Sequence, residues 1–201
     1  MKTLATPWPE RVLVIRELES HEEWLTRDEL AVANGFRLEK RRDEWLLSRV
    51  AAKQLAMELG LVRDPRTCEV VRPQLVIEGR PSEWFVSLSH SQPYAGAALS
   101  REPLGLDVQV LRELPEAAAH LFLSPEEEEE MRNCAVAHRM LHFWSAKEAA
   151  WKKRGGAVPT LRQVPLRLVR SGETFVEFDE VESVQLDDVI VALAAATHRT
   201  S

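Results

Sequence analysis

The sequence has few of the features that mark secreted or membrane proteins. Its two cysteines, Cys68 and Cys134, are too few for a disulfide framework and fit a reducing compartment. No apolar run approaches the roughly 20 residues that cross a bilayer, and residues 1–20 lack the continuous apolar block of a secretory signal. The sequence therefore predicts a cytoplasmic protein without membrane contact.

Glycine-rich phosphate loops and nucleophile elbows are also missing. The sequence contains no Walker-type or dinucleotide-binding glycine pattern and no Gly-x-Ser-x-Gly segment. These absences argue against P-loop, Rossmann and α/β-hydrolase enzymes.

The charge pattern argues against a general nucleic-acid-binding protein. The formal net charge is -6, whereas such proteins carry a broad basic face. Two basic segments, residues 36–53 and 152–156, interrupt the acidic background. They favour a compact polyanion such as a nucleotide or CoA, although each segment could instead be a solvated helix face.

The order of the expected elements indicates an α+β protein in two parts. Helices are expected around residues 20–25, over 39–61, from 124 and over 142–153; strands are expected at 11–18, 68–81, 83–100, 103–111, 161–180 and 189–196. Strands, helices and strands therefore occur twice, with a boundary near residues 101–104.

The segment HFWSAKEAAWKK carries an acidic residue on an apolar helical face. Leu141, Trp144, Glu148 and Trp151 follow the spacing of one face, and we expect this helix to be buried between two layers. A buried carboxylate is costly unless a cation meets it. A lysine or a metal ion is therefore expected beside Glu148.

The strand GLDVQV places polar side chains on one face. Alternation separates Asp107 and Gln109 from the apolar residues of the strand. Asp107 and Glu148, from two elements, could hold Mg²⁺, while Ser89, His90 and Lys152 could bind phosphates. Structural ion pairs are the alternative.

Two other clusters contain residue types that can bind metals. Cys134, His138 and His142 are spaced by four residues and could be zinc ligands on an unbroken helix, but a fourth ligand is not evident. The glutamate run 126–130 follows Ser124 and Pro125, which is typical of a capped helix start rather than a metal cluster.

Several segments together resemble the 4'-phosphopantetheinyl transferase superfamily. LGLDVQVL, FWSAKEAAWKKRGG and SLSHSQPYAGAAL match its signatures in the expected order. KRRDEWLLSRVAAK and EGRP resemble the basic helix and the turn of the longer, surfactin-synthetase-activator-like type. The resemblance covers roughly residues 36–165.

The resemblance implies two similar halves, 1–103 and 104–201, related by a pseudo-twofold axis, with CoA and Mg²⁺ between them and a monomeric chain. The implied reaction moves 4'-phosphopantetheine from CoA to a serine of an acyl or peptidyl carrier protein and releases adenosine 3',5'-bisphosphate. A non-catalytic protein that binds CoA or a carrier protein is the alternative.

The resemblance also implies residue roles. Asp107 and Glu148 would bind Mg²⁺, Glu148 would be the general base, and Lys152 would stabilise the pyrophosphate or protonate the leaving group. Phosphate contacts would come from Ser89 and His90, and further from Arg80, Arg42 and Lys53; Trp144 and Lys147 would be mainly structural. Gln109 departs from the pattern, because many longer members have an acidic third ligand there; its amide oxygen could still coordinate the metal or orient a metal-bound water.

Overall fold

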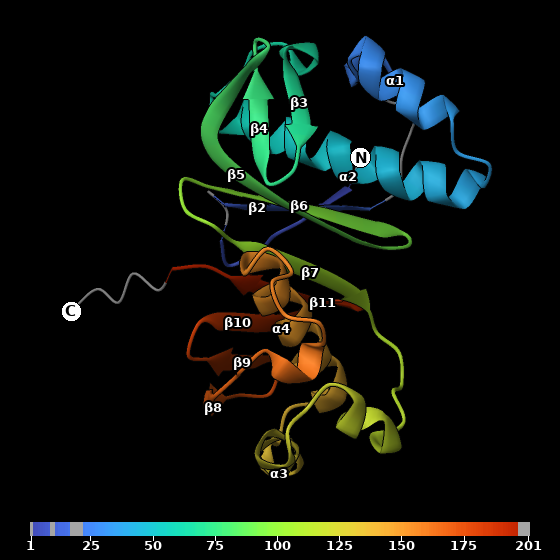
Figure 1. Ribbon diagram of the computed structural model, residues 1–201. Coiled ribbons are helices and arrows are strands. Elements are labelled where there is room, and N and C mark those ends of the chain that lie inside the picture. Colours follow the sequence, from blue (N-terminus) through green and yellow to red (C-terminus); the bar gives the residue numbers. More distant parts are fainter. Residues whose placement is uncertain (1, 9–10, 17–21, 197–201) are drawn as a thin grey trace. The chain divides into compact units, whose positions relative to one another are not determined.

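The computed structural model describes residues 2–8, 11–16 and 22–196. The chain forms two compact units, an N-terminal unit Met1–Glu102 and a C-terminal unit Pro103–Ser201 (Figure 1). Each unit contains an antiparallel sheet covered by helices, which confirms the predicted α+β class. The pseudo-twofold relation between the halves stays a prediction.

The N-terminal unit is built on a six-stranded antiparallel sheet. Its strands are β1 (Lys2–Leu4), β2 (Val12–Arg16), β3 (Cys68–Val71), β4 (Gln74–Ile77), β5 (Arg80–Ser91) and β6 (Tyr94–Ser100), hydrogen-bonded in the order β1-β2-β6-β5-β4-β3. Its helical segments are η1 (Glu22–Trp24), α1 (Arg27–Asn34), α2 (Glu39–Glu58) and η2 (Pro65–Thr67).

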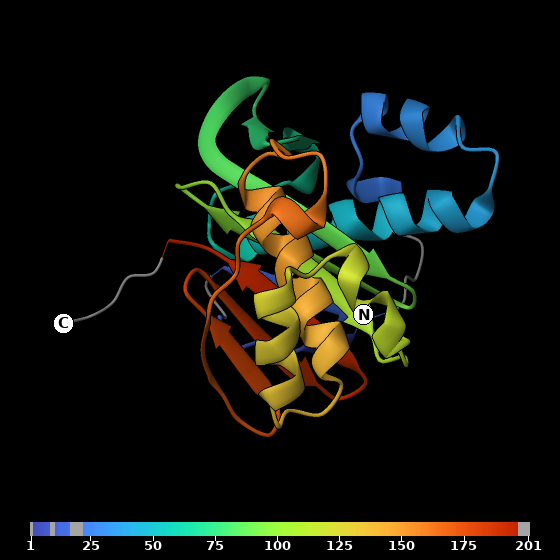
Figure 2. The same cartoon turned by 60° about the horizontal axis from the view of Figure 1, so that its bottom comes forward.

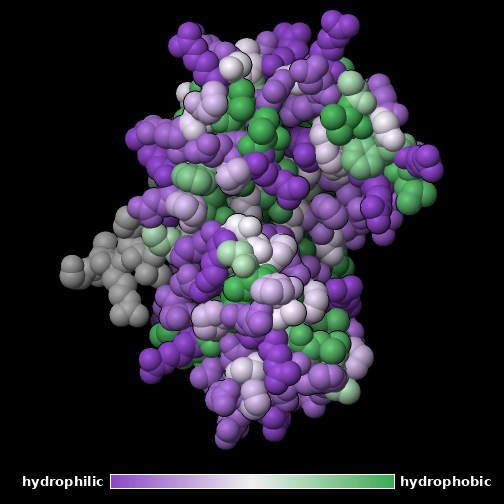
Figure 3. Space-filling model, in the orientation of Figure 1, coloured by the Kyte–Doolittle hydropathy of each residue, from purple (hydrophilic) through white to green (hydrophobic). Residues whose placement is uncertain are grey.

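Helix α2 forms the core of this unit against β2, β5 and β6 (Figure 1). Leu46, Val50 and Leu55 are buried, whereas Trp45 and Leu59 are only partly buried. The exposed large apolar side chains of this unit include Val32 on α1 and Leu38 just before α2. The space-filling view shows hydrophobic residues, in green, over the part of this unit that holds α1 and α2, within a mostly hydrophilic surface (Figure 3).

The C-terminal unit is built on a five-stranded antiparallel sheet. Its strands are β7 (Gly105–Val110), β8 (Leu168–Ser171), β9 (Phe175–Phe178), β10 (Val181–Leu186) and β11 (Val189–Ala194), in the order β7-β11-β10-β9-β8. Its helical segments are η3 (Glu116–Leu121), α3 (Pro125–Asn133), α4 (Arg139–Lys153) and η4 (Leu161–Gln163). Figure 2 shows α3 beside α4, and the two helices are in contact.

Helix α4 lies directly on β7 because β7 begins with a glycine. A Cβ atom at Gly105 would lie 1.8 Å from the carbonyl oxygen of Ala149 and 2.7 Å from the amide nitrogen of Lys153. Only glycine allows this approach. Because side chains alternate along a strand, Asp107 and Gln109 share the face of Gly105 and point toward α4.

In the N-terminal unit, a capping glutamate pairs with a buried lysine. Thr26 and Glu29 form a capping box at the start of α1. The carboxylate of Glu29 also lies 2.9 Å from Lys53 Nζ on α2 and accepts a hydrogen bond from the amide of Val70. Lys53 is fully buried and donates further to the carbonyl oxygens of Pro65 and Cys68.

The C-terminal unit repeats this arrangement. Ser124 and Glu127 form the capping box of α3, which confirms the predicted helix start. Lys147 Nζ on α4 lies 2.7 and 2.6 Å from the two carboxylate oxygens of Glu127, and the amide of Leu166 donates to the same carboxylate. Each unit thus anchors its long helix through an internal ion pair.

Some elements differ from the sequence expectations. The helix expected around residues 20–25 is the single 3-10 turn η1, and residues 20 and 21 lie outside the described residues. Helix α1 and strands β1 and β10 were not predicted. Among the helices of the described residues, none combines the length and apolar character that a bilayer-crossing segment needs.

Candidate functional site

Asp107 is the centre of a hydrogen-bonded cluster between β7 and α4. Its side chain is 2% exposed. One carboxylate oxygen, Oδ1, accepts from Lys152 Nζ at 2.8 Å. The other, Oδ2, accepts from Ser145 Oγ at 3.0 Å and from Gln109 Nε2 at 2.9 Å. The carboxylate is therefore held by donors from both elements.

Lys152 links α4 to β7. Its ammonium also donates to the carbonyl oxygen of Leu106 at 2.9 Å. The side chain is 24% exposed, unlike the fully buried side chains of Lys53 and Lys147. Lys152 is therefore the lysine of these three that has access to solvent and to a ligand.

Glu148 carries a carboxylate that accepts no hydrogen bond from the residues that the structure describes. Among the same residues, its oxygens form no ion pair. Its pKa is raised, chiefly because partial burial penalises the charged form and further because Asp107 is negative; Lys152 partly offsets this. A half-buried anion beside a second carboxylate is an environment that favours a cation.

The chemistry of Asp107 and Glu148 fits Mg²⁺. Two carboxylates are the kind of protein ligand set on which this ion keeps several waters and binds substrate phosphates. Within the described residues, no group of three or more His, Cys, Asp or Glu side chains suits a metal. A magnesium site here would therefore rest on these two carboxylates, water and substrate.

Gln109 is hydrogen-bonded to Asp107 within the cluster. Its amide nitrogen donates to Asp107, while its amide oxygen faces Arg112 Nη2 at 3.5 Å. These two partners fix which end of the amide points at the carboxylate. Gln109 is thus a donor to a candidate ligand, and its role as a metal ligand stays a prediction.

The two tryptophans flank Glu148 but do not bury it. Trp144, Glu148 and Trp151 are all partly exposed, whereas Leu141 on the same stripe and most of α4 are buried, so the expected burial of this helix holds except along these three residues. Trp144 packs edge-on against Phe122 with ring centroids 5.1 Å apart, and Trp151 Nε1 donates to the carbonyl of Val158 at 2.9 Å. The indoles attach α4 to neighbouring segments on either side of the carboxylate.

The remaining predicted phosphate contacts lie in the N-terminal unit. Ser89 and His90 are near the end of β5, and His90 Nδ1 lies 3.8 Å from a carboxylate oxygen of Glu44 on α2. Arg80 is exposed at the start of β5, and Arg42 on α2 pairs with Glu22.

Lys53 is a correction to the predicted set. Its buried ammonium donates to two carbonyl oxygens and pairs with Glu29, so its three N–H donors have partners inside the N-terminal unit. Lys147 is likewise buried and paired, as the structural role predicted for it requires. Desolvation lowers the pKa of Lys147, and Glu127 partly restores it.

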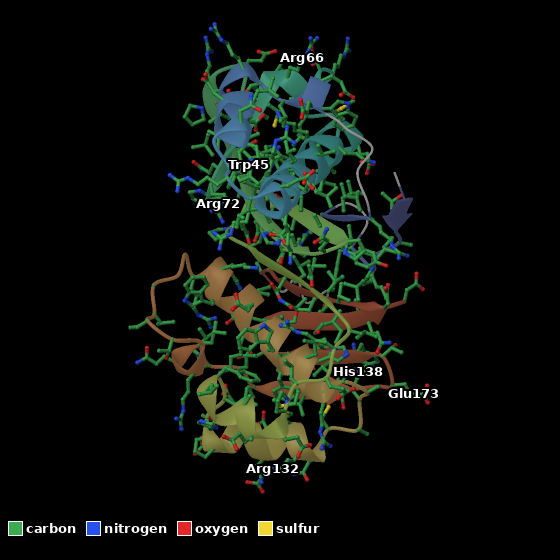
Figure 4. All side chains as sticks on the ribbon, turned by 90° about the vertical axis from the view of Figure 1, so that its right-hand side faces the viewer. Trp45, Arg66, Arg72, Arg132, His138 and Glu173 are labelled. Carbon is green, nitrogen blue, oxygen red and sulfur yellow. The ribbon has the colours of Figure 1, made fainter. Side chains whose placement is uncertain are left out.

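The zinc alternative fails because the required helix is broken. Helix α3 ends at Asn133, and α4 begins at Arg139 after His138, which has a positive φ of 51° (Figure 4). His142 is buried, with Nδ1 2.8 Å from Ser183 Oγ. Cys134, His138 and His142 therefore do not share one helical face.

Ser145 was missed by the sequence reasoning. It is fully buried on α4, and its hydroxyl reaches Asp107 across to β7. A serine inside a largely apolar helix was the available signal, because a buried hydroxyl there needs a partner.

Residues 103–194 match the model of the 4'-phosphopantetheinyl transferase superfamily. The match spans most of the C-terminal unit, which is therefore similar to members of this superfamily. The chain is also 34% identical over 122 residues to enterobactin synthase component D of Escherichia coli strain K12. It is 32% identical over 118 residues to the proteins of that name from Escherichia coli O157:H7 and Shigella flexneri.

The similarity to these relatives is partial. Each match covers 56% of this chain and 54% of the relative, so the chain spans about half the length of the curated relatives it matches. The superfamily match contains all of the β7 and α4 residues around Asp107.

Proposed function

We propose that the protein transfers the 4'-phosphopantetheine group of CoA to a serine of an acyl or peptidyl carrier protein. The reaction would depend on Mg²⁺ and release adenosine 3',5'-bisphosphate. The observation that carries the proposal is the placement of Glu148 and Lys152 beside Asp107, in a unit that matches the model of the 4'-phosphopantetheinyl transferase superfamily.

Asp107 and Glu148 would hold the metal. Bound Mg²⁺ would supply positive charge beside the CoA pyrophosphate as negative charge develops there. The two carboxylates would then set where the pyrophosphate lies relative to α4, since Asp107 is on β7 and Glu148 is on this helix.

Glu148 is the proposed general base. Its raised pKa makes the carboxylate a better proton acceptor than an ordinary glutamate. It would take the proton of the carrier serine as the serine oxygen bonds to the pantetheine-bearing phosphorus. The bond from that phosphorus to the bridging pyrophosphate oxygen breaks.

Lys152 is proposed to stabilise the leaving group. Its ammonium is partly exposed and lies beside Asp107, so a short side-chain movement would bring it to a phosphate oxygen. It would balance the charge on the departing adenosine 3',5'-bisphosphate or give it a proton.

The N-terminal unit would contribute nucleotide contacts. We assign Ser89, His90, Arg80 and Arg42 to the phosphates of CoA. Exposed side chains at Arg80 and His90 support this assignment. Lys53 is left out because its ammonium is buried and paired.

The partner is proposed to be a carrier protein of a biosynthetic synthase. The relatives named above are components of enterobactin synthase by name, which supports a synthase partner. Two similar halves related by a pseudo-twofold axis, a monomeric state and a cytoplasmic location complete the proposal.

The experiment is a transfer assay read by mass. The protein is incubated with CoA, Mg²⁺ and several purified apo-carrier proteins, and each carrier is weighed by mass spectrometry. We expect a gain of one phosphopantetheine group on the carrier serine. Unchanged carriers in every pairing, with CoA intact, would contradict the proposal.

A non-catalytic binding protein is the second candidate. The observation that favours it is Gln109, which brings no negative charge to the cluster. Isothermal titration with CoA separates the two functions: this candidate predicts CoA binding without modification of any carrier.

A further inference from the structure

The two carboxylate oxygens of Asp107 have different surroundings. Oδ2 accepts hydrogen bonds from two neutral donors, Ser145 Oγ and Gln109 Nε2. Oδ1 accepts from the charged ammonium of Lys152. One oxygen is therefore tied to the protein framework, and the other faces a cation.

We propose that Ser145 and Gln109 are positioning residues that commit Oδ2 of Asp107 to the protein and leave Oδ1 as its cation-binding oxygen, which Lys152 occupies until a divalent cation displaces it. The inference rests on the proposed function for the identity of the cation site. Ser145 and Gln109 are thereby added to that site, and the ammonium of Lys152 occupies it before a divalent cation binds.

Ser145 is placed to orient the carboxylate. Its side chain is fully buried on α4, so its hydroxyl has a fixed position. Serine hydroxyls inside helices commonly bond back to a carbonyl of their own helix, whereas this one donates to a residue on β7 at 3.0 Å. Outer hydrogen bonds of this kind fix the direction in which a carboxylate ligand points.

Gln109 supplies the second bond to the same oxygen. It comes from β7 itself, whereas Ser145 comes from α4. Two donors from different elements restrict rotation of the carboxylate about its Cβ–Cγ bond. Oδ1 is thereby directed toward the place now taken by the ammonium of Lys152.

Lys152 has the properties of an exchangeable cation. Lys53 and Lys147 have fully buried side chains, each paired with a capping glutamate, whereas Lys152 is 24% exposed. Its flexible four-carbon stem allows the ammonium to leave Asp107 and remain nearby. A freed Lys152 is then available to substrate phosphates.

The charge balance favours exchange. Lys152 brings one positive charge to a region with two carboxylates, and Glu148 has no hydrogen bond or ion pair among the described residues. A divalent cation would compensate both carboxylates. The displaced ammonium would move toward the negative charge of a bound pyrophosphate.

The test is direct cation binding to the full-length protein without CoA. Mn²⁺ is the probe, because it takes the same oxygen ligands as Mg²⁺ and its free concentration is read by electron paramagnetic resonance. Ser145→Ala should weaken Mn²⁺ binding by about tenfold, as loss of an outer hydrogen bond to a ligand does. Lys152→Met should tighten it by about fivefold, which corresponds to about 1 kcal/mol for a partly exposed pair.

Matched variants keep the test independent of folding. Ser48→Ala removes another buried helical serine, whose hydroxyl donates to the carbonyl of Trp45, and it should leave Mn²⁺ binding unchanged. Gln109→Met removes the second donor at a partly exposed position and should weaken binding in the same direction as Ser145→Ala.

The positioning and exchange roles can be overturned separately from the transfer function. Wild-type affinity in both Ser145→Ala and Gln109→Met would overturn the positioning role, and unchanged or weaker affinity in Lys152→Met would overturn the exchange. If carriers are modified but these affinities do not move, the inference fails and the function stands. If the affinities move as expected but no carrier is modified, the function fails and the cation site stands.

Discussion

Lys152 Nζ lies 2.8 Å from Oδ1 of Asp107, so the helix that carries Glu148 also carries the counter-ion of the neighbouring carboxylate. This contact depends on the approach of α4 to β7, because Lys152 and Asp107 belong to these two elements. The chemistry of the cluster is therefore coupled to the packing of one helix on one strand.

Gly105→Ala should disturb that packing. The added methyl would meet the carbonyl of Ala149 at 1.8 Å, so α4 must shift away from β7. We expect a loss of about 1–3 kcal/mol in the free energy of unfolding, as for other overpacked sites. We also expect reduced transfer, because Glu148 and Lys152 move with the helix.

Urea unfolding and the carrier mass assay check this prediction together. Gly35→Ala is the control, since a Cβ there would lie 3.3 Å from its nearest neighbour and the glycine φ is −80°. If Gly105→Ala matches wild type in both measurements, the close contact between α4 and β7 is not required.

Lys53→Met should affect stability rather than CoA binding. The substitution leaves the carboxylate of Glu29 buried without its cation. Removing one partner of a buried ion pair costs about 3–5 kcal/mol. Chemical unfolding measures the loss, and titration with CoA should show wild-type affinity per folded molecule.

The double variant Lys53→Met with Glu29→Gln separates the two roles of Lys53. It removes both charges and should recover part of the lost stability, because no unpaired anion remains. A large loss of CoA affinity in a variant that is fully folded would instead restore Lys53 to the phosphate site.

Stability should fall in mild acid through His142. Burial, and to a lesser degree the charge of His138, lower its pKa from 6.5 to about 4. A depressed pKa means that the neutral form is favoured in the folded protein. The stability that depends on neutral His142 is therefore complete above about pH 6.5. It is lost as the pH falls toward 4, which lowers the free energy of unfolding by roughly 3 kcal/mol in total.

Glu148 acts in the opposite direction, because its raised pKa favours the protonated folded state. His142→Asn isolates the histidine while keeping a donor near Ser183. Unfolding free energies measured between pH 7 and 4 should fall less steeply in this variant. An identical pH profile would mean that His142 does not titrate as described.

Gln109→Glu should make stability depend more strongly on divalent cations. The change replaces a donor to Asp107 with a second carboxylate about 3 Å away, and like charges at that distance repel. We expect a lower unfolding temperature without Mg²⁺ and a larger increase when Mg²⁺ is added. Thermal unfolding across a Mg²⁺ titration measures both, and superimposable curves for the two proteins would contradict the effect.

The local patterns of the sequence predicted much of the site. Strand alternation put Asp107 and Gln109 on one face, and helical spacing put Lys152 one turn beyond Glu148. These relations depend on neighbours in the chain, so periodicity reveals them.

Relations between distant residues were harder to predict. Lys53 looked like a surface cation because its partner, Glu29, lies on another helix. The orientation of the Gln109 amide depended on Arg112 and Asp107 together. The break between α3 and α4 depended on the left-handed backbone of His138, which is uncommon outside glycine.

Two elements that were not predicted, α1 and β10, have recognisable features in the sequence. Thr26 and Glu29 have the spacing of a capping box, which marks the start of α1. The segment VESVQL of β10 alternates apolar and polar residues only over its last three positions, Val184 to Leu186. Both elements are short and lie between segments whose helical or strand periodicity is stronger.

The central claim is that Glu148 is the general base of phosphopantetheine transfer, and Glu148→Gln tests it most directly. Its carboxylate accepts no hydrogen bond among the described residues, so the amide should leave the unfolding temperature unchanged or slightly raised. The rate at which carrier proteins gain the phosphopantetheine mass should fall by at least about 100-fold. Wild-type transfer by this folded variant would contradict the account and leave Glu148 without a catalytic role.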